Sequence, residues 1–305
     1  MLMFVSRRVL QALLTILGVL AATFFLVRAG GDPVALLLPV EATPADIARL
    51  RSALGLDRSI VEQFIRFVLH AAQGDFGDSL RQRTPALGLV LERLPATLEL
   101  ALISFVLGIV LAFVAGLAMR LTGSRKLGAF FLWIAFTRQA IPVFWFGVLM
   151  ILIFSVTLGW LPSLGRGGVS HLVLPTLTLG TYEFGLYLRL FNAAMAKEQG
   201  QDYVRTAYAK GQRRSVVTLR DMLPNALLPL ITIAGLNLGT LLGGAVVTET
   251  VFSWPGVGRL IIDAVSQRDY PVVVTGVLVV CIIFVAANLL VDLLYGLLDP
   301  RVRVS

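Results

Sequence analysis

Long apolar segments recur along the whole chain, and they limit the folds open to it more than any other feature. A helix of roughly 20 apolar residues is long enough to cross the hydrocarbon core of a bilayer. Inside lipid, a helix satisfies every backbone hydrogen-bonding group within its own segment. We therefore predict an all-α integral membrane protein with six transmembrane helices. The predicted spans are 9–27, 96–119, 140–159, 172–190, 227–248 and 272–291.

Composition agrees with a membrane protein. Of the residues, 57% are hydrophobic and 14% are charged, whereas soluble domains carry about 25% charged residues. The first apolar run resembles a signal peptide, because Arg7-Arg8 precede it and Val27-Arg28-Ala29 has the form of a cleavage site. The run is longer than the usual hydrophobic region of about 7–15 residues. We interpret residues 1–29 as a retained N-terminal transmembrane helix.

Basic residues indicate the orientation of the spans, since short cytoplasmic loops carry an excess of Lys and Arg. The short loops predicted to be outside contain only Arg166, Arg259 and Arg268. This asymmetry predicts a multi-pass protein with both termini in the cytoplasm. The residues predicted to lie inside are Arg7, Arg8, Arg120, Arg125, Lys126, Arg138, Lys197, Arg205, Lys210, Arg213, Arg214, Arg220, Arg301 and Arg303.

Two amphipathic helices are expected in the extracytoplasmic segment 30–95. Thr43 and Pro44 form a typical helix start, and Ser59 with Glu62 forms a capping box. Residues 96–305 are expected to form the permease core with the other five spans. Within it, the apolar residues 127–136 are too few to cross the bilayer, so we predict a separate cytoplasmic interfacial helix there.

The most informative polar stretch is the predicted cytoplasmic loop 196–229. Tyr203, Ala207 and Ala209 form a small-residue face at helical spacing, and Gly211 interrupts the pattern. A second amphipathic run follows, and Pro224 is expected to end it. The loop therefore predicts a helix, a turn and a second helix that present a small-residue surface to a partner. The alternative is a basic loop held by anionic lipid.

Polar groups and glycines inside the spans have two interpretations each. Glu183 is the acidic residue nearest the middle of a span, and a structural contact to a neighbouring helix is the favoured role over a conduction path. Gly235, Gly239 and Gly243 recur every four residues, which lets helices approach closely. That approach could be within the chain or against a second subunit at the pore, and the spacing does not distinguish the two.

Several familiar sites are missing from the sequence. There is no phosphate-binding loop of the form GxxxxGK[ST], so we expect ATP and Mg²⁺ to bind a different polypeptide. No HExxH or GxSxG motif indicates a protease or hydrolase. One cysteine, Cys281, and two distant histidines predict no metal site and no cofactor in this chain. The basic residues flank apolar spans, which does not indicate nucleic acid.

The polar loop resembles the EAA loop of ABC-importer membrane subunits. Ala207, Gly211, Leu223 and Pro224 match that pattern in register. Arg205, Thr206 and Asp221 stand where the general family has Glu, Ala and Ile. The stretch DYVRTAYAKG is similar to DYIRTARAKG of the dipeptide and oligopeptide branch, with Tyr208 in place of Arg.

Other segments carry the same resemblance, which extends over nearly the whole chain. The loop ETVFSWPGVG followed by RDYP is similar to the outer loop of the peptide and nickel permease branch. The run AIPVFWFG resembles SxPxFxxG, with Ala140 in place of Ser. The branch usually has a second Arg shortly after the position of Arg189, where this chain has Leu190-Phe191-Asn192. The departures near the polar loop point to a divergent partner ATPase.

The resemblance implies the type I importer permease fold, with a coupling helix between spans four and five, and it assigns residues to three groups. The ATPase-coupling group is Asp202, Tyr203, Arg205, Thr206, Ala207, Lys210, Gly211, Leu223 and Pro224. The group at the outer gate, where a binding protein would dock, is Glu249, Phe252, Trp254, Pro255, Gly256, Asp269 and Tyr270. The helix-packing and pore group is Pro142, Phe144, Gly235, Gly239 and Gly243.

The implied function is that of a B-type permease subunit in the bacterial cytoplasmic membrane. The implied partners are a C-type sister permease, two cytoplasmic ATPases that contact residues 199–222, a periplasmic or lipid-anchored binding protein, and membrane lipid. The substrate stays open among dipeptides, oligopeptides, nickel, glutathione and opines. The alternative is a self-sufficient secondary carrier, which would need intramembrane ionisable pairs and usually an inverted repeat. Neither is apparent.

Overall fold

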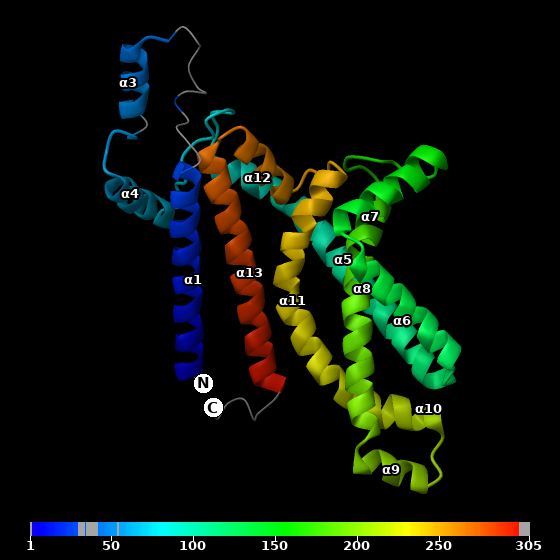
Figure 1. Ribbon diagram of the computed structural model, residues 1–305. Coiled ribbons are helices and arrows are strands. Elements are labelled where there is room, and N and C mark those ends of the chain that lie inside the picture. Colours follow the sequence, from blue (N-terminus) through cyan, green and yellow to red (C-terminus); the bar gives the residue numbers. More distant parts are fainter. Residues whose placement is uncertain (1, 30–33, 35–41, 54, 299–305) are drawn as a thin grey trace.

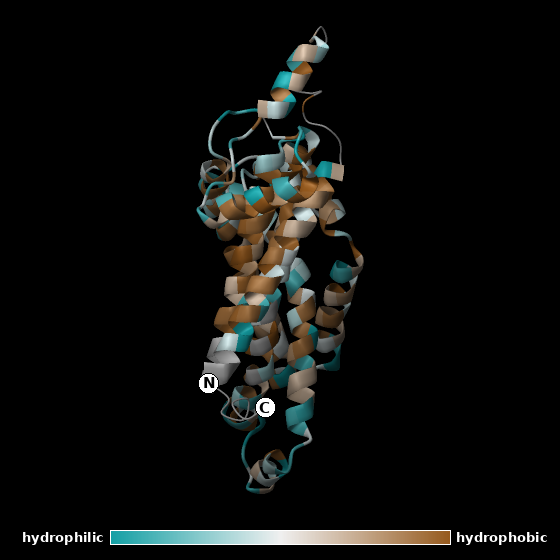
Figure 2. Cartoon of the chain, turned by 90° about the vertical axis from the view of Figure 1, so that its left-hand side faces the viewer, coloured by the Kyte–Doolittle hydropathy of each residue, from teal (hydrophilic) through white to brown (hydrophobic). Residues whose placement is uncertain are grey.

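The computed structural model describes residues 2–29, 34, 42–53 and 55–298. Every regular element within these ranges is a helix, and the predicted all-α membrane fold is confirmed. The helices stand as a bundle (Figure 1). Figure 2 shows hydrophobic residues along the body of the bundle and hydrophilic residues concentrated toward its two ends. The Leu2 end of α1 (Leu2–Ala29) and the Leu298 end of α13 (Tyr270–Leu298) lie at the same end of the bundle (Figure 1).

Two short helices follow α1 and begin where the sequence predicts. They are α3 (Pro44–Ala53) and α4 (Ile60–Ala72). The Thr43 side chain accepts a hydrogen bond from the backbone N–H of Asp46 at 3.3 Å, and the Ser59 hydroxyl accepts one from the N–H of Glu62 at 3.3 Å. These caps satisfy backbone donors that the first turn of a helix leaves unpaired.

Two long helices, α5 (Ala86–Thr122) and α8 (Val169–Gln199), form the centre of the bundle. They approach closely at two glycines. A Cβ atom on Gly108 of α5 would lie 2.9 Å from the carbonyl oxygen of Gly180 on α8, and one on Gly180 would lie 2.9 Å from the carbonyl oxygen of Ser104. Because no larger residue fits at either position, the two glycines permit the backbone contact on which the pair is built.

The segment between α5 and α8 forms two successive helices, as the sequence predicts. α6 (Arg125–Ala140) packs along α8 and has Ala135 and Arg138 buried in the bundle. It is followed by α7 (Val143–Met150) and the π-helix η1 (Ile151–Thr157), which turn away by 105°. The predicted separate helix over 127–136 is therefore present as α6, and its interfacial position stays a prediction. Pro142 causes the break, because it lacks the N–H that would continue the helix of α6.

The C-terminal half contains a second close helix pair, α11 (Leu223–Val251) and α13. α12 (Val257–Ser266) connects them, and α1 packs against α13 on its other side. A Cβ on Gly235 would lie 2.4 Å from Val291, and one on Gly239 would lie 1.9 Å from Phe284, whereas Gly243 has open space beside it. Gly235 and Gly239 thus serve packing within the chain, and only Gly243 is exposed.

Judged by length and composition, fewer helices qualify as membrane spans than the six that the sequence predicts. Four described helical segments are long and apolar enough to cross a membrane, or five if the bent pair of α6 with α7 and η1 is one span. They are Ser6–Ala29, Ala86–Thr122, Arg214–Gly235 and Tyr270–Val291. α8 has 31 residues, so it is long enough at about 1.5 Å per residue, but it carries buried polar groups such as Glu183. The count of six stays a prediction.

The α11–α13 contact gives a paired test of packing. Gly239→Ala would place a methyl group against the ring of Phe284, and overpacking of this kind costs roughly 1–3 kcal/mol. In Gly243→Ala, the added Cβ meets no atom within 4 Å. Replacing a glycine by alanine inside a helix stabilises the helix by about 0.5–1 kcal/mol. In detergent, the thermal unfolding midpoint should fall for the first variant and stay or rise for the second. Equal shifts would contradict the packing described here.

Candidate coupling element and outer cap

The polar loop after α8 forms a compact hairpin, which we call the coupling hairpin (residues 202–222). It consists of α9 (Asp202–Ala209), a turn, the short α10 (Arg214–Val216) and the π-helix η2 (Val217–Met222). The coupling hairpin lies beyond the ends of α8 and α11, at the end of the bundle where α1 begins (Figure 1). One side is buried against the bundle in a cluster of Phe191, Met195, Val204, Ala207, Val217, Met222 and Ala226.

The turn depends on Gly211. Its φ is +76°, a left-handed conformation that disfavours side chains, as expected for a residue between two helical runs. The N–H of Gly211 donates to the carbonyl oxygen of Tyr208 at 2.9 Å, and the N–H of Gln212 donates to that of Ala207 at 3.2 Å. These bonds satisfy carbonyls at the end of α9 and return the chain toward the bundle.

Two expectations about this element are wrong. Ala207 does not face a partner, because its side chain is buried in the chain's own apolar cluster. Pro224 does not end the second helical run, which continues through η2 into α11 with Pro224 in the first turn, where its missing N–H has no intrahelical partner to lose. The other predicted coupling residues are exposed, apart from half-buried Leu223. The exposed ones are Asp202, Tyr203, Arg205, Thr206, Lys210, Gly211 and Pro224.

The base of the coupling hairpin is fixed by hydrogen bonds. The Tyr203 hydroxyl donates to Glu198 Oε2 and accepts from Asn225 Nδ2 at 3.2 Å, so it links α8, α9 and α11. Desolvation and the bond to Glu198 raise the pKa of the Tyr203 hydroxyl above its usual value, so it stays neutral. Arg120 of α5 donates to Gln199 Oε1 at 2.9 Å and to the carbonyl oxygen of Asn192 at 3.0 Å. These bonds therefore fix the position of the coupling hairpin, whose other face is exposed.

At the other end of the bundle, residues 249–270 form what we call the outer cap. Glu249, in the last turn of α11, is fully buried and accepts two hydrogen bonds. One comes from Thr97 Oγ1 of α5 at 2.6 Å and the other from the N–H of Arg259 at 3.0 Å. Thr97 in turn accepts from the N–H of Val257 at 2.8 Å. A buried carboxylate is stable only when bonded in this way, so Glu249 joins α5, α11 and α12.

Aromatic residues fill the turn between α11 and α12. Trp254 is fully buried, and its indole N–H donates to the carbonyl oxygen of Ala96 at 2.8 Å. Phe252 is buried as well, and its carbonyl oxygen accepts from the N–H of Gly165 at 2.8 Å. A Cβ on Gly256 would lie 2.1 Å from Glu249 Oε1, so only glycine fits beside the buried carboxylate.

Asp269 closes the outer cap against the segment before α5. It is buried and accepts from the hydroxyl of Ser79 and from the N–H of Leu80 at 3.0 Å. Glu249, Phe252, Trp254, Gly256 and Asp269 thus lie inside the chain and stabilise the cap. They do not form a surface on which another protein could dock, and of that predicted group only Pro255 and Tyr270 are partly exposed.

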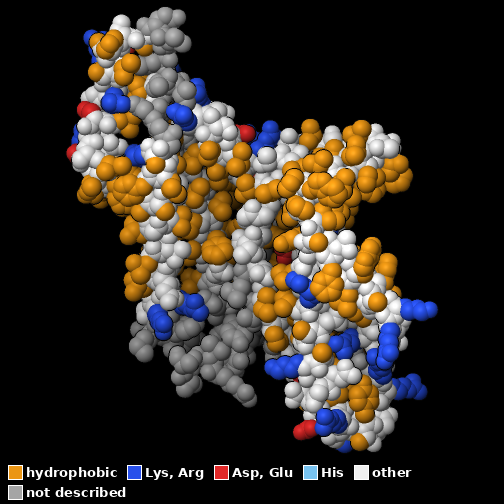
Figure 3. All heavy atoms as spheres, in the orientation of Figure 1, with side chains coloured by type: hydrophobic (Ala, Val, Ile, Leu, Met, Phe, Trp, Pro, Cys, Tyr) orange, Lys and Arg blue, Asp and Glu red, His pale blue; other side chains and the backbone are white. Residues whose placement is uncertain are grey.

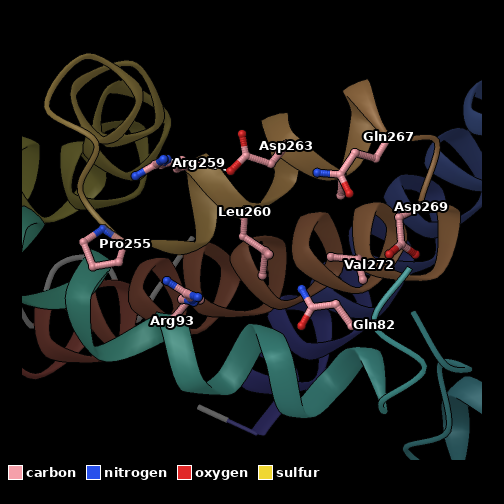
Figure 4. A pocket seen from close by; sticks show the side chains of 11 residues that line it. Gln82, Arg93, Pro255, Arg259, Leu260, Asp263, Gln267, Asp269 and Val272 are labelled. Atoms are coloured by element: carbon pink, nitrogen blue, oxygen red, sulfur yellow. Dashed lines mark ion pairs between the residues drawn. The ribbon is translucent and has the colours of Figure 1, made fainter. Parts of the chain in front are cut away.

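The exposed feature of the outer cap is a polar cleft (Figure 4). It has a volume of about 230 Å³ and lies between α12 and the start of α5. Arg259 and Asp263 of α12 form an ion pair at 3.7 Å on its rim, and Gln82 and Arg93 face them. Three non-glycine residues with positive φ lie within two positions of residues that line this cleft, and such conformations concentrate at functional sites. They are Arg83, Ser253 and Arg268.

The predicted packing and pore residues are not brought to one place. Pro142 forms the bend before α7, Phe144 is exposed on α7, and Gly235 and Gly239 of α11 face α13. Arg138, predicted from the sequence to lie in the cytoplasm, is a buried residue with a structural role. Arg138 is buried and donates to Thr181 Oγ1 at 2.9 Å and to the carbonyl oxygen of Ile141 at 3.2 Å, and its guanidinium lies 4.0 Å from the Phe146 ring centre.

Nothing in the sequence signals the position of Arg138, because only the packing of α6 on α8 buries it. Thr97 was also missed, since its role follows from the contact with Glu249, more than a hundred residues away along the chain.

Within the described ranges, no group of three or more His, Cys, Asp or Glu side chains could hold a metal ion.

Comparison with known proteins identifies the family. Residues 92–304 match the family described as binding-protein-dependent transport system inner membrane component, and residues 1–101 match its N-terminal region. The chain is 37% identical to the di/tripeptide transport system permease protein DppB of Pseudomonas aeruginosa, with 99% of each chain covered. It is 38% identical to the glutathione transport system permease protein GsiC of Salmonella paratyphi A, again with 99% of each covered.

Solved structures agree on the fold. The chain is similar to the MetNI methionine ABC transporter, with a TM-score of 0.57 and 22% identity, over 69% of this chain and 96% of that chain. It is also similar to an amino acid ABC transporter, with a TM-score of 0.54 and 14% identity, over 70% of this chain and 94% of the other. The chain belongs to the family of binding-protein-dependent transport system inner membrane components, the permease subunits of ABC importers, and is a transport component rather than an enzyme.

Proposed function

We propose that this chain forms one half of the translocation pathway of an ATP-driven importer, with a sister permease of the C type as the other half. The observation that carries the proposal is the coupling hairpin. It has a fixed base between α8 and α11 and an exposed face directed away from the bundle. A rigid element of this kind can transmit force from an attached subunit, because its own side chains fix its position.

The proposed contact of the coupling hairpin is a groove on a cytoplasmic ATPase. This contact uses the exposed residues Tyr203, Arg205, Thr206 and Lys210 and the turn at Gly211. Two such ATPase subunits would bind ATP and Mg²⁺, and this chain would hold no cofactor. The proposed topology has six spans, with α8 among them, and both termini in the cytoplasm of a bacterial cell.

We further propose that a periplasmic or lipid-anchored binding protein docks at the opposite end. The exposed polar cleft, with Arg93, Arg259 and Asp263 on its rim, is the candidate surface there. This replaces the buried residues of the outer cap as the docking site. The cap's internal hydrogen bonds would hold the cleft in shape when the binding protein arrives.

The proposed substrates are dipeptides or related small solutes. The named relatives transport di- and tripeptides, dipeptides and glutathione, and they match this chain over nearly its full length. All of these solutes carry a peptide bond, which makes a peptide-like substrate the favoured class. A self-sufficient secondary carrier does not fit a chain of this family.

The proposed topology is testable with thiol labelling in intact cells. In a Cys281→Ala background, Gln73→Cys places a thiol on an exposed residue next to α4, and Ser215→Cys places one on the exposed side of the coupling hairpin. A membrane-impermeant maleimide should label position 73 from outside and position 215 only after the cells are permeabilised. The opposite pattern would overturn the orientation. Ser79 is unsuitable as a site because it is buried against Asp269.

The coupling role is testable at Gly211. A Cβ there meets no atom within 4 Å, so Gly211→Asp should insert and fold, although a left-handed φ costs a non-glycine residue roughly 1–2 kcal/mol. We expect it to reduce recovery of the ATPase with the purified permease and to stop uptake of radiolabelled peptides, compared at equal permease levels.

Gly200→Asp is the matched control for this experiment. Gly200 is exposed, it lies just before α9, and its φ of −80° is accessible to any residue. The same change of charge at this position should leave ATPase recovery and uptake unchanged. If the loop is instead a surface for anionic lipid, attraction spread over many basic residues at about 1 kcal/mol each predicts similar small effects for both variants. That result would refute the coupling role.

A further inference from the structure

The helix α4 is fixed to the last turns of α1 by a cluster of rings. Phe24 of α1 lies with its ring centre 5.2 Å from that of Phe64 and 5.6 Å from that of Phe67, and Phe25 lies 5.4 Å from Phe64. Arg28 donates to Gln63 Oε1 at 2.9 Å. These contacts position α4 across the Ala29 end of α1 (Figure 1).

The depth of α4 follows from its attachment to a span. α1 is apolar from residue 9 to residue 27 and has arginines at both ends of that run. At about 1.5 Å per residue, this run is roughly 28 Å long, close to the hydrocarbon thickness of about 30 Å. Phe24 lies roughly 4–5 Å inside the end of the run. Since α4 packs on Phe24 and Phe25, it lies at the level where the acyl chains meet the headgroups.

The sequence of α4 gives the helix three different faces. The face with Phe64, Phe67 and Ala71 is directed at α1 and is partly buried there. A polar face carries a row of ionisable residues every four positions, in which Arg58 and Arg66 pair with Glu62 at 2.6 and 3.2 Å. The third face is apolar and exposed, and it contains the stripe Val61, Ile65 and Leu69.

The apolar stripe is more exposed than a helix in water would tolerate. Val61 is 60% exposed, Ile65 53% and Leu69 57%. Successive members of the stripe lie about one helical turn apart, so together they form one exposed apolar strip. α1, to which α4 is attached, also has exposed apolar residues that would contact lipid. Figure 3 shows hydrophobic side chains over the region of α4 and along α1. The α1 residues are Leu10, Leu13, Leu14, Leu17, Phe25 and Leu26.

We propose that α4 is a membrane-surface helix whose stripe Val61, Ile65 and Leu69 is inserted into the lipid leaflet at the Ala29 end of α1. The occupant of this face is the acyl-chain boundary of the bilayer, and the row Arg58, Glu62 and Arg66 faces the headgroups and water. Helices of this kind bury their apolar face about 5–10 Å into the interface, which agrees with the depth set by Phe24. The inference rests on α1 crossing the membrane and does not depend on the substrate or the coupling hairpin.

This arrangement has a consequence for the segment between α1 and α5. A helix that is held by both α1 and lipid cannot move freely, so the chain that follows it, up to the bond between Ser79 and Asp269, starts from a fixed point. Under the proposed topology, the leaflet is the outer one and the fixed segment borders the polar cleft.

The experiment uses nitroxide labels on the full chain reconstituted in liposomes. In the Cys281→Ala background, single cysteines replace Val61, Ile65 and Leu69 on the stripe and Glu62 and Arg66 on the polar face. Power saturation compares collisions with oxygen, which partitions into lipid, and with a water-soluble nickel chelate. The ratio of oxygen to nickel accessibility should be several-fold higher at 61, 65 and 69 than at 62 and 66. Leu17→Cys on α1 provides the value for lipid contact.

Two outcomes would overturn the proposal. Higher nickel than oxygen accessibility at 65 would mean that the stripe faces water. Low accessibility to both reagents at 61, 65 and 69 would mean that protein covers the stripe, either a second copy of the chain or another part of it. Because labels at neighbouring positions on one helix are compared, an unfolded variant would be recognised by the loss of the periodic pattern over residues 61–69.

Discussion

The close contact between α5 and α8 determines where most other helices lie. Lipid provides no hydrophobic drive for helices to associate, so the pair depends on backbones that approach closely at Gly108 and Gly180. α6, α7 and α11 all pack on α8, while α12 and α13 pack on α5, and α13 in turn holds α1. Glu183 lies at this contact, where a Cβ on Gly108 would come within 2.6 Å of it. Its burial is therefore a consequence of the glycine pair.

The segments at the two ends of the bundle are held in place by different kinds of interaction. At each end, the segment that connects two helices must be held in a fixed place against the bundle. At the outer cap, buried side chains do this: Glu249 and Asp269 accept hydrogen bonds from distant segments. At the coupling hairpin, the apolar cluster around Met195 fixes one side and leaves the polar side exposed. α11 joins the two regions, with the hairpin before its first residue and Glu249 in its last turn.

Membrane attachment extends beyond the spans. The sequence predicts an interfacial helix at 127–136, and the structure packs that segment along α8 as α6, while α4 has the features of a surface helix. The difference lies in the neighbours. An apolar run of ten residues fits either place, and the ring contacts of Phe24 with Phe64 and Phe67 decide the position of α4. Length and composition alone carry no such information.

The sequence by itself determined the all-helical membrane fold, the helix starts at Thr43 and Ser59, the hairpin with its turn at Gly211, and the family. These depend on local properties: apolar length, capping chemistry and a backbone angle that favours glycine. Only the tertiary structure decided which side chains are buried and which are exposed. In the folded chain, Ala207, Glu249, Trp254 and Asp269 are buried, and Arg138 is buried within the bundle. The second helical run continues past Pro224 into α11. The reason is that burial depends on contacts between different helices, which can be far apart along the chain, as Thr97 and Glu249 are, and no local pattern records them.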